Sequence, residues 1–277
     1  MIPAAFDYHR PAELGEALAL AGGEGVAGDS PVVMAGGQSL VAALRRRALR
    51  PSSVVDLAGL DELRLLGEAG TASSVGALCT YASLASDPLI RGAAAMLAHV
   101  AGRLGDPALR TMATLGGAAA LAHPNSDMAV VLVALGAEVV LSAAGERGPT
   151  SRRVRAAELF VGPFRTCLRR GELIVGFEIP ESPGRWSYRR FTGRAQGWPV
   201  VCAAVVETEG PPRVVLGGLG PVPLRAEQVE AALEGGGGPD AASRLVIEAA
   251  PGGDDAGFRR HVAASVLAGA LAEVLGT

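Results

Sequence analysis

Near the start of the chain, short apolar runs alternate with stretches whose apolar residues recur at helical spacing. Residues 11–22 have helical spacing and begin with a proline, a residue favoured in the first turn of a helix. Apolar runs at residues 31–34 and 53–57 predict strands, and residues 39–49 between them predict a helix. The opening segment therefore predicts a small unit of β-α-β type.

From about residue 58 the pattern predicts a second unit that mixes strands with helices. Its predicted strands are residues 73–77, 138–141 and 173–180. Its predicted helices are one beginning at 81–85, a long one over 89–104 and an apolar one over 128–135. Because the apolar stretch 128–141 is short and is interrupted by Gly136 and Glu138, we expect a buried helix and strand there, not a membrane span.

After Pro183 a run of strands is followed by a run of helices. The predicted strands are residues 186–191, 200–206 and 213–219, and the predicted helices are 226–233, 241–249 and 256–275. This order predicts an α+β layer, in which helices cover one face of a sheet. The patterns divide the chain into a first subdomain (1–57), a second subdomain (58–180) and a C-terminal α+β domain (184–277).

Composition and charge limit the classes of function that fit the chain. A length of 277 residues suits two domains or subdomains, and a net charge of −3 with a pI near 5.9 gives no basic field for nucleic acid. The N-terminus lacks the charged and apolar regions of a signal peptide, and no stretch is long and apolar enough to span a membrane. We therefore expect a cytoplasmic protein.

The cysteine residues offer no metal site. Cys79, Cys167 and Cys202 lie far apart in the sequence and lack the spacing of metal ligands. An iron–sulfur cluster needs about four closely placed thiolates, so we expect this chain to hold none by itself. The hydrolytic motifs GxSxG and HExxH are also missing, and no residue is assigned a catalytic role. In an enzyme, a cofactor would therefore supply the chemistry.

Two glycine-bearing motifs are the main candidates for a ligand site. The first comprises Met34, Ala35, Gly36, Gly37, Gln38, Ser39 and Leu40, and the second comprises Thr114, Leu115, Gly116, Gly117 and Ala118. A Gly-Gly pair can adopt positive φ and lets backbone N–H groups approach an anion. Two such turns predict a ligand with two phosphates, as in a dinucleotide. Neither has the spacing of GxGxxG or of the P-loop, so a tight turn without a ligand stays as the alternative.

Polar residues near these motifs each allow two interpretations. Asp127 directly precedes the apolar helix, where it either caps the helix or accepts a hydrogen bond from a ribose hydroxyl. Arg45, Arg46 and Arg47 follow the first glycine motif and form either a solvated helix face or a surface for a partner.

Taken together, the motifs resemble the FAD-binding medium subunit of the molybdenum hydroxylase family, which includes carbon monoxide dehydrogenase medium subunits and the flavin domain of xanthine dehydrogenase. The resemblance follows the family's order along nearly the whole chain. It rests on residues 6–11, both glycine motifs, residues 124–127, residues 172–180 and residues 217–225.

The resemblance implies a two-subdomain FAD-binding domain followed by a smaller C-terminal domain. It also implies that the two glycine motifs hold the FAD diphosphate through backbone N–H groups and that Asp127 contacts the ribose. Ile174 and the surroundings of Trp198 would lie near the adenine or the flavin ring. The implied partners are an iron–sulfur subunit and a molybdopterin-binding subunit, in a heterotrimer or a dimer of heterotrimers. Electrons would leave to NAD, a quinone or another acceptor.

Three residues depart from the family pattern. Ala113 stands in place of a glycine, Ala118 in place of an asparagine, and His123 where an acidic residue is common. We expect FAD binding to survive these changes. Two alternatives stay open: a stand-alone FAD-dependent oxidoreductase that acts on a small metabolite, and a scaffold that has lost its flavin and only binds partners.

Overall fold

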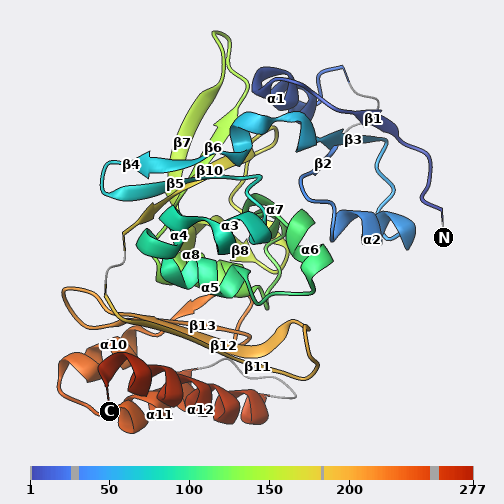
Figure 1. Ribbon diagram of the computed structural model, residues 1–277. Coiled ribbons are helices and arrows are strands. Elements are labelled where there is room, and N and C mark those ends of the chain that lie inside the picture. Colours follow the sequence, from blue (N-terminus) through green and yellow to red (C-terminus); the bar gives the residue numbers. More distant parts are fainter. Residues whose placement is uncertain (1, 26–30, 182–183, 250–255, 277) are drawn as a thin grey trace.

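The computed structural model describes residues 2–25, 31–181, 184–249 and 256–276. Figure 1 shows the N-terminal subdomain and one sheet in the upper part, a layer of helices in the middle, and a further sheet with its helices at the bottom. The predicted boundary between residues 180 and 184 falls on residues 182–183, which lie outside the described residues.

The N-terminal subdomain is built on a parallel sheet with the strand order β1-β3-β2. Its elements are β1 (Asp7–His9), α1 (Leu14–Gly22), β2 (Val32–Met34), α2 (Leu40–Arg45) and β3 (Ser53–Asp56). Helix α1 buries Ala17 and Leu18 in a small core that also contains Val55. The predicted β-α-β unit is present, with β1 as an additional strand. Helix α2 is shorter than the predicted 39–49, because the chain turns at Arg47, which has a φ of +57°.

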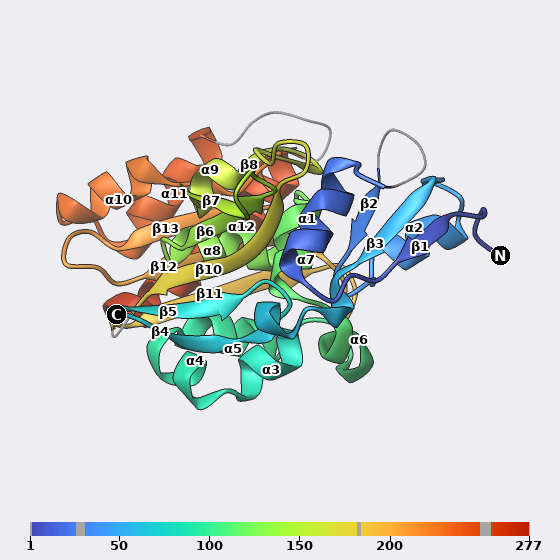
Figure 2. The same ribbon diagram turned by 90° about the horizontal axis from the view of Figure 1, so that it is seen from above.

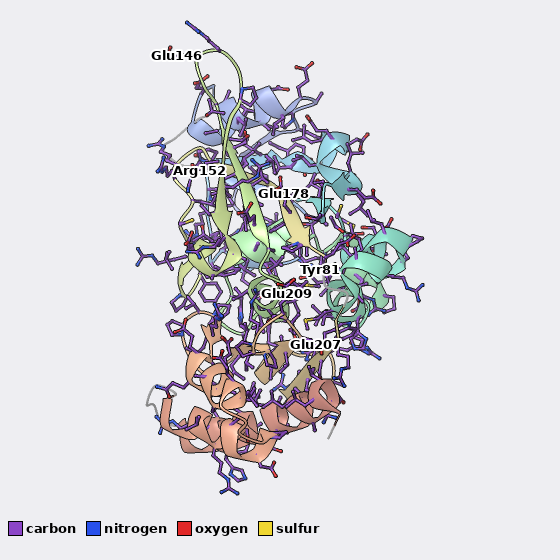
Figure 3. The ribbon with its side chains drawn as sticks, turned by 90° about the vertical axis from the view of Figure 1, so that its left-hand side faces the viewer. Tyr81, Glu146, Arg152, Glu178, Glu207 and Glu209 are labelled. Carbon is purple, nitrogen blue, oxygen red and sulfur yellow. The ribbon has the colours of Figure 1, made fainter. Side chains whose placement is uncertain are left out.

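The second subdomain contains an antiparallel sheet with the order β4-β5-β10-β6-β7. Its strands are β4 (Leu66–Ala69), β5 (Ala72–Gly76), β6 (Glu138–Ala143), β7 (Thr150–Arg155) and β10 (Leu173–Pro180). Strands β6 and β7 form a long hairpin, with Glu146 at its tip (Figure 3). A 2-stranded sheet, β8 (Phe160–Gly162) with β9 (Arg165–Thr166), follows the helix α9 (Ala156–Leu159).

Short helices form the layer below this sheet. They are α3 (Tyr81–Ser86), α4 (Pro88–Ala93), α5 (Ala95–Ala101), α6 (Pro107–Met112), α7 (Leu115–Leu121) and α8 (Asp127–Ala134). Side chains of Asp87, Asp106 and Ser126 accept N–H groups in the first turns of α4, α6 and α8, so polar caps explain where these helices begin. The prediction of one long helix over 89–104 is wrong, because the backbone leaves helical geometry at Ala94 (φ −131°, ψ 52°). Every residue of α8 is buried, as its apolar sequence predicted.

The C-terminal domain has an antiparallel sheet in the order β11-β12-β13-β14. Its elements are β11 (Trp186–Thr192), β12 (Pro199–Val206), β13 (Arg213–Gly217), β14 (Leu224–Arg225), α10 (Glu227–Glu234), α11 (Pro239–Ala249) and α12 (Ala256–Leu275). Along β12, Val201 and Val205 pack in a core with residues of α12. Cys202 and Ala204 face the opposite way and join the core around α8. The sequence predicted that helices cover one face of this C-terminal sheet. The structure shows both faces covered, one by α12 and the other by the helical layer that contains α8.

Candidate functional site

A cavity of about 620 Å³ lies where the three units meet. The N-terminal subdomain contributes the first glycine motif and Leu57, and the second subdomain contributes α3, α6, α7 and the start of β10. The C-terminal domain closes one side with Arg190 and residues 196–198. In the view from above (Figure 2), the strands β1–β3 lie at one end of the molecule. The volume falls in the range typical of cofactor and ligand sites.

The first glycine motif forms one wall of this cavity, with unpaired backbone donors. Gly37 has a φ of +70°, in the left-handed region that favours glycine. Gly36 packs directly on α6, where an added Cβ would lie 1.9 Å from the carbonyl oxygen of Met112. Among the described residues, no acceptor pairs with the N–H groups of residues 36–40. Consecutive free N–H groups of this kind form a concave site for an anion.

The second glycine motif differs from the predicted turn, because its residues begin helix α7. The side chain of Thr114 caps this helix by accepting the N–H of Gly117. A Cβ on Gly116 would lie 2.7 Å from both Cβ and O of Ala77, so this glycine permits close packing and has no positive φ. The N–H groups of Leu115 and Gly116 donate to backbone carbonyls of Cys79 and Ala77. The expectation that this motif offers free N–H donors is therefore wrong for residues 115–118, whose N–H groups are all paired.

Asp127 is 2% exposed and lines the cavity, and the helix cap is its neighbour Ser126. The interpretation of Asp127 as the cap is therefore wrong. Its Oδ1 accepts a hydrogen bond of 2.6 Å from the hydroxyl of Tyr188 and lies 3.2 Å from Nε of Arg190. Burial raises the pKa of Asp127, and the charge of Arg190 and the hydrogen bond from Tyr188 partly oppose this shift. Both partners belong to β11, so the C-terminal domain positions a carboxylate of the cavity.

Two further polar groups lie at the cavity. Tyr81, among the central helices (Figure 3), has a hydroxyl with no hydrogen-bond partner in the described part of the chain. Glu172 forms a bidentate ion pair with Arg152 of β7, with two N–O distances of 2.7 Å. Hydrogen bonds from Arg152 lower the pKa of Glu172, and the N–H of Arg169 also donates to this carboxylate. This pair fixes the turn before β10, whose Leu173 and Ile174 line the cavity.

Trp198 lines the cavity on the side of the C-terminal domain and packs against further aromatic side chains. Trp198 stacks on the ring of His123, with centroids 4.1 Å apart and an angle of 5° between the planes. Phe164 meets the same histidine edge to face, at 5.2 Å. Ala122, Phe164 and Gln196 have positive φ although none is glycine, so strained backbone gathers beside this stack. Burial lowers the pKa of His123, which favours the neutral ring.

Most of the predicted site residues meet in this cavity. The predicted residues that line it are Ala35, Gly36, Gly37, Gln38, Ser39, Leu40, Thr114, Gly116, Gly117, Ala118, Asp127 and Ile174. Met34 and Leu115 do not line it: Leu115 is wholly buried, and Met34 lies beneath Gly37. Sequence reasoning did not find Tyr81 and Arg190, because no local motif marks a residue that reaches the cavity only through tertiary packing.

Within the residues that the structure describes, no group of three or more His, Cys, Asp and Glu side chains stands where it could hold a metal ion. The described helices include none with both the length and the hydropathy that crossing a bilayer requires.

Comparison with known proteins gives consistent matches. Residues 4–182 match the model of the FAD binding domain in molybdopterin dehydrogenase. The chain is 34% identical to the glyceraldehyde dehydrogenase medium chain of Sulfolobus acidocaldarius, over 83% of this chain and 81% of that protein. It is 32% identical to the carbon monoxide dehydrogenase medium chain of Hydrogenophaga pseudoflava, over 82% of this chain and 79% of the relative.

The solved structures agree with the sequence relatives. A chain of carbon monoxide dehydrogenase from Hydrogenophaga pseudoflava, in a form without the Mo-pyranopterin moiety, superposes with a TM-score of 0.91 at 30% identity. The match covers 100% of this chain and 99% of the other. This agreement confirms the resemblance and the mixed α+β architecture expected from the sequence. The chain therefore belongs to the FAD-binding medium subunits of the molybdenum hydroxylase family.

Proposed function

We propose that this chain holds FAD in the cavity described above and serves as the electron-transfer subunit of a molybdenum hydroxylase-type complex. The observation that carries the site assignment is the run of N–H groups over residues 36–40 that have no acceptor in the described part of the chain, at the wall of a cavity of about 620 Å³. FAD joins an anionic diphosphate to two planar ring systems. The free N–H groups suit the diphosphate, and the apolar walls suit the rings, so the residues present fit this cofactor.

The site residues take separate roles in this assignment. Residues 35–40 bind the diphosphate, with Met34 supporting Gly37 from below. Thr114, Gly116, Gly117 and Ala118 form a wall that a ligand approaches closely, and the buried Leu115 anchors it. Asp127, whose carboxylate lines the cavity, accepts a hydroxyl of the ribose. Ile174 and Trp198 lie against the ring systems.

The bound flavin supplies the ability to accept electrons singly and to release them as a pair. The protein orients the cofactor and keeps water from it. Arg152 and Glu172 hold the turn that carries Leu173 and Ile174, and His123 holds Trp198 at the opposite wall. Because Asp127 is held by Tyr188 and Arg190, the C-terminal domain takes part in fixing the cofactor.

We further propose that the electrons come from an iron–sulfur subunit and that a molybdopterin-binding subunit completes a heterotrimer or a dimer of heterotrimers. The support is that several relatives of this chain are named medium chains or subunits of dehydrogenases and hydroxylases. The acceptor is NAD, a quinone or another carrier. In this scheme the substrate of the complex is bound by the molybdenum subunit.

Purification of the tagged chain from its native host tests this proposal. We expect it to bring down two further polypeptides, one containing iron–sulfur clusters and one containing the molybdenum cofactor. The isolated chain should transfer electrons from NADH to an artificial acceptor but hydroxylate no substrate. A flavin-containing chain that purifies alone and oxidises a metabolite by itself would contradict the proposal and favour the stand-alone oxidoreductase.

A further inference from the structure

His123 connects the cavity wall to the second subdomain. Its ring stacks on the ring of Trp198, with centroids 4.1 Å apart and an angle of 5° between the planes. Trp198 lines the cavity, whereas His123 lies behind it and does not itself line the cavity. Any effect of this histidine on a bound cofactor therefore passes through the ring of Trp198.

Two further contacts hold the ring of His123 in this orientation. Its Nδ1 accepts a hydrogen bond of 3.1 Å from the backbone N–H of Asn125. Because an imidazole nitrogen accepts a hydrogen bond only when it carries no proton, the form that fits is the neutral ring with its proton on Nε2. Phe164 also meets the ring of His123, edge to face, at 5.2 Å. The contacts therefore select one orientation and one protonation state of the ring.

The backbone around these rings is strained. Ala122, Phe164 and Gln196 have φ values of +45°, +56° and +61°. Arg47 is the only other non-glycine residue with positive φ in the described part of the chain. The N–H of Phe164 donates to the carbonyl oxygen of Ala122 over 2.8 Å, which ties the β8–β9 hairpin to the residue before His123. Strained backbone gathers at ligand sites, so its presence here favours a role for these rings at the cavity.

No charged neighbour favours a proton on His123. The charged residues on the elements around it are Asp127 at the start of α8, Arg165 of β9 and Arg194 in the turn before β12. None of them shifts the pKa of His123, which burial alone lowers below its usual value of 6.5. A cationic ring would be attracted to the aromatic faces, but it would be desolvated and would lose the hydrogen bond from Asn125. Two effects thus oppose protonation, and one favours it.

We propose that neutral His123 is a positioning residue of the cofactor site, which holds Trp198 against FAD and makes FAD binding weaken as the pH falls. This inference rests on the proposed function and adds to it a pH dependence of the same site. Above pH 6.5 the ring is neutral and the stack is complete. As the pH falls through the folded-state pKa, Nδ1 takes up a proton and no longer accepts the N–H of Asn125. Trp198 then loses its support.

Three variants separate this role from a merely structural one. His123→Phe keeps an aromatic ring that can stack but cannot take up a proton, and Trp198→Ala removes the ring through which His123 acts. His99→Phe is the matched control, because His99 also contacts a tryptophan, Trp186, at 5.0 Å, and burial also lowers its pKa. Neither His99 nor Trp186 lines the cavity.

The assay is a titration of FAD-free protein with FAD, followed by flavin fluorescence, at about pH 8 and about pH 5, the range in which histidine titrates. Thermal unfolding at both pH values checks that each variant is folded. The quantity compared is the ratio of the FAD dissociation constant in acid to that at the higher pH. Burial raises the pKa of Asp127, so protonation of this carboxylate contributes to the ratio in every variant alike.

We expect the ratio in the wild type and in His99→Phe to exceed that in His123→Phe by roughly two- to 13-fold, the contribution of one hydrogen bond. In Trp198→Ala the ratio should fall to the His123→Phe value, and adding His123→Phe to Trp198→Ala should not lower it further. Equal ratios in the wild type and His123→Phe would overturn the inference and leave FAD binding itself in place. A wild-type ratio in Trp198→Ala would also overturn it. If the wild-type chain binds no FAD at either pH, the proposed function fails and the inference fails with it.

Tryptophan fluorescence follows the stack without any cofactor. The chain has two tryptophans, so Trp186→Phe leaves Trp198 as the only one. We expect its emission to change with pH as His123 takes up a proton, with a midpoint below 6.5, and to lose this change when His123→Phe is added. Emission from the folded Trp186→Phe protein that does not change with pH would contradict the inference, whether or not His123→Phe folds.

Discussion

Replacing Gly36 with alanine is the most informative single change at the cavity. The new Cβ would lie 1.9 Å from the carbonyl oxygen and 2.8 Å from the carbonyl carbon of Met112. Real Cβ contacts are longer than 3.0 Å, so loop and helix must separate by about 1.1 Å. Both clashing atoms are backbone, so a change of rotamer cannot relieve the contact. The free N–H groups that follow Gly36 would move with the loop.

The size of the effect follows from two separate costs. Overpacking costs about 1–3 kcal/mol of folding free energy, which corresponds to a fall in Tm of roughly 2–12 °C for a domain of this size. Each hydrogen bond to a charged phosphate contributes about 1.5–3 kcal/mol, so losing one weakens FAD binding roughly ten- to 150-fold. Gly36→Ala should therefore lower both the Tm of the FAD-free protein and the affinity for FAD.

The assay is a titration of FAD-free protein with FAD, followed by flavin fluorescence, together with thermal unfolding. Gly15→Ala in α1 is the matched control, because its added Cβ meets nothing within 4 Å and alanine favours a helix. The control should bind FAD normally and unfold at the same or a slightly higher temperature. Wild-type affinity and Tm in Gly36→Ala would refute the reasoning about this loop.

Three further changes test other parts of the site. Tyr81→Phe removes an unpaired hydroxyl, so FAD should bind roughly two- to 13-fold more weakly by titration if that group bonds the cofactor, with the Tm of the FAD-free protein unchanged. Tyr188→Phe leaves buried Asp127 without its hydroxyl donor, and urea unfolding should show a loss of about 1–3 kcal/mol. Because the folded-state pKa of Glu172 lies below its usual value of 4.5, its pairing with Arg152 stabilises the protein above that pH and is lost as pH falls through the folded pKa. Glu172→Gln should lower the Tm at pH 7 and reduce the decline of Tm in acid; an unchanged pH profile would contradict this.

Regular elements could be predicted from the sequence, because their periodic patterns coincide with burial in the structure. The predicted helix over 256–275 and the strand over 173–180 have the observed bounds. Strands β1, β4 and β7 could not be predicted from apolar pattern, because most of their side chains are only partly buried or exposed. The break at Ala94 was also missed: Gly92 stands two residues earlier, but it lies inside α4 and a single glycine does not by itself end a helix.

The part of the site that depends on local backbone conformation could be predicted from the sequence. Gly37 adopts the positive φ that its motif predicted, and the N–H groups of residues 36–40 have no acceptor among the residues that the structure describes. Gly116 belongs to a similar sequence motif but serves helix packing against Ala77, and only the tertiary structure distinguishes the two cases. Arg190 reaches the cavity from a strand more than sixty residues beyond Asp127, so no local pattern could indicate it.

The central claim is that the cavity beside residues 36–40 holds FAD, and the most direct test is to identify the cofactor of the purified chain. The protein is expressed alone, its visible spectrum is measured, and any nucleotide released by heat is identified and quantified. The account predicts a flavin spectrum and close to one FAD per chain, or full recovery of this spectrum when FAD is added. A colourless protein that neither takes up FAD nor gains thermal stability from it would contradict the account and leave a scaffold that has lost its flavin.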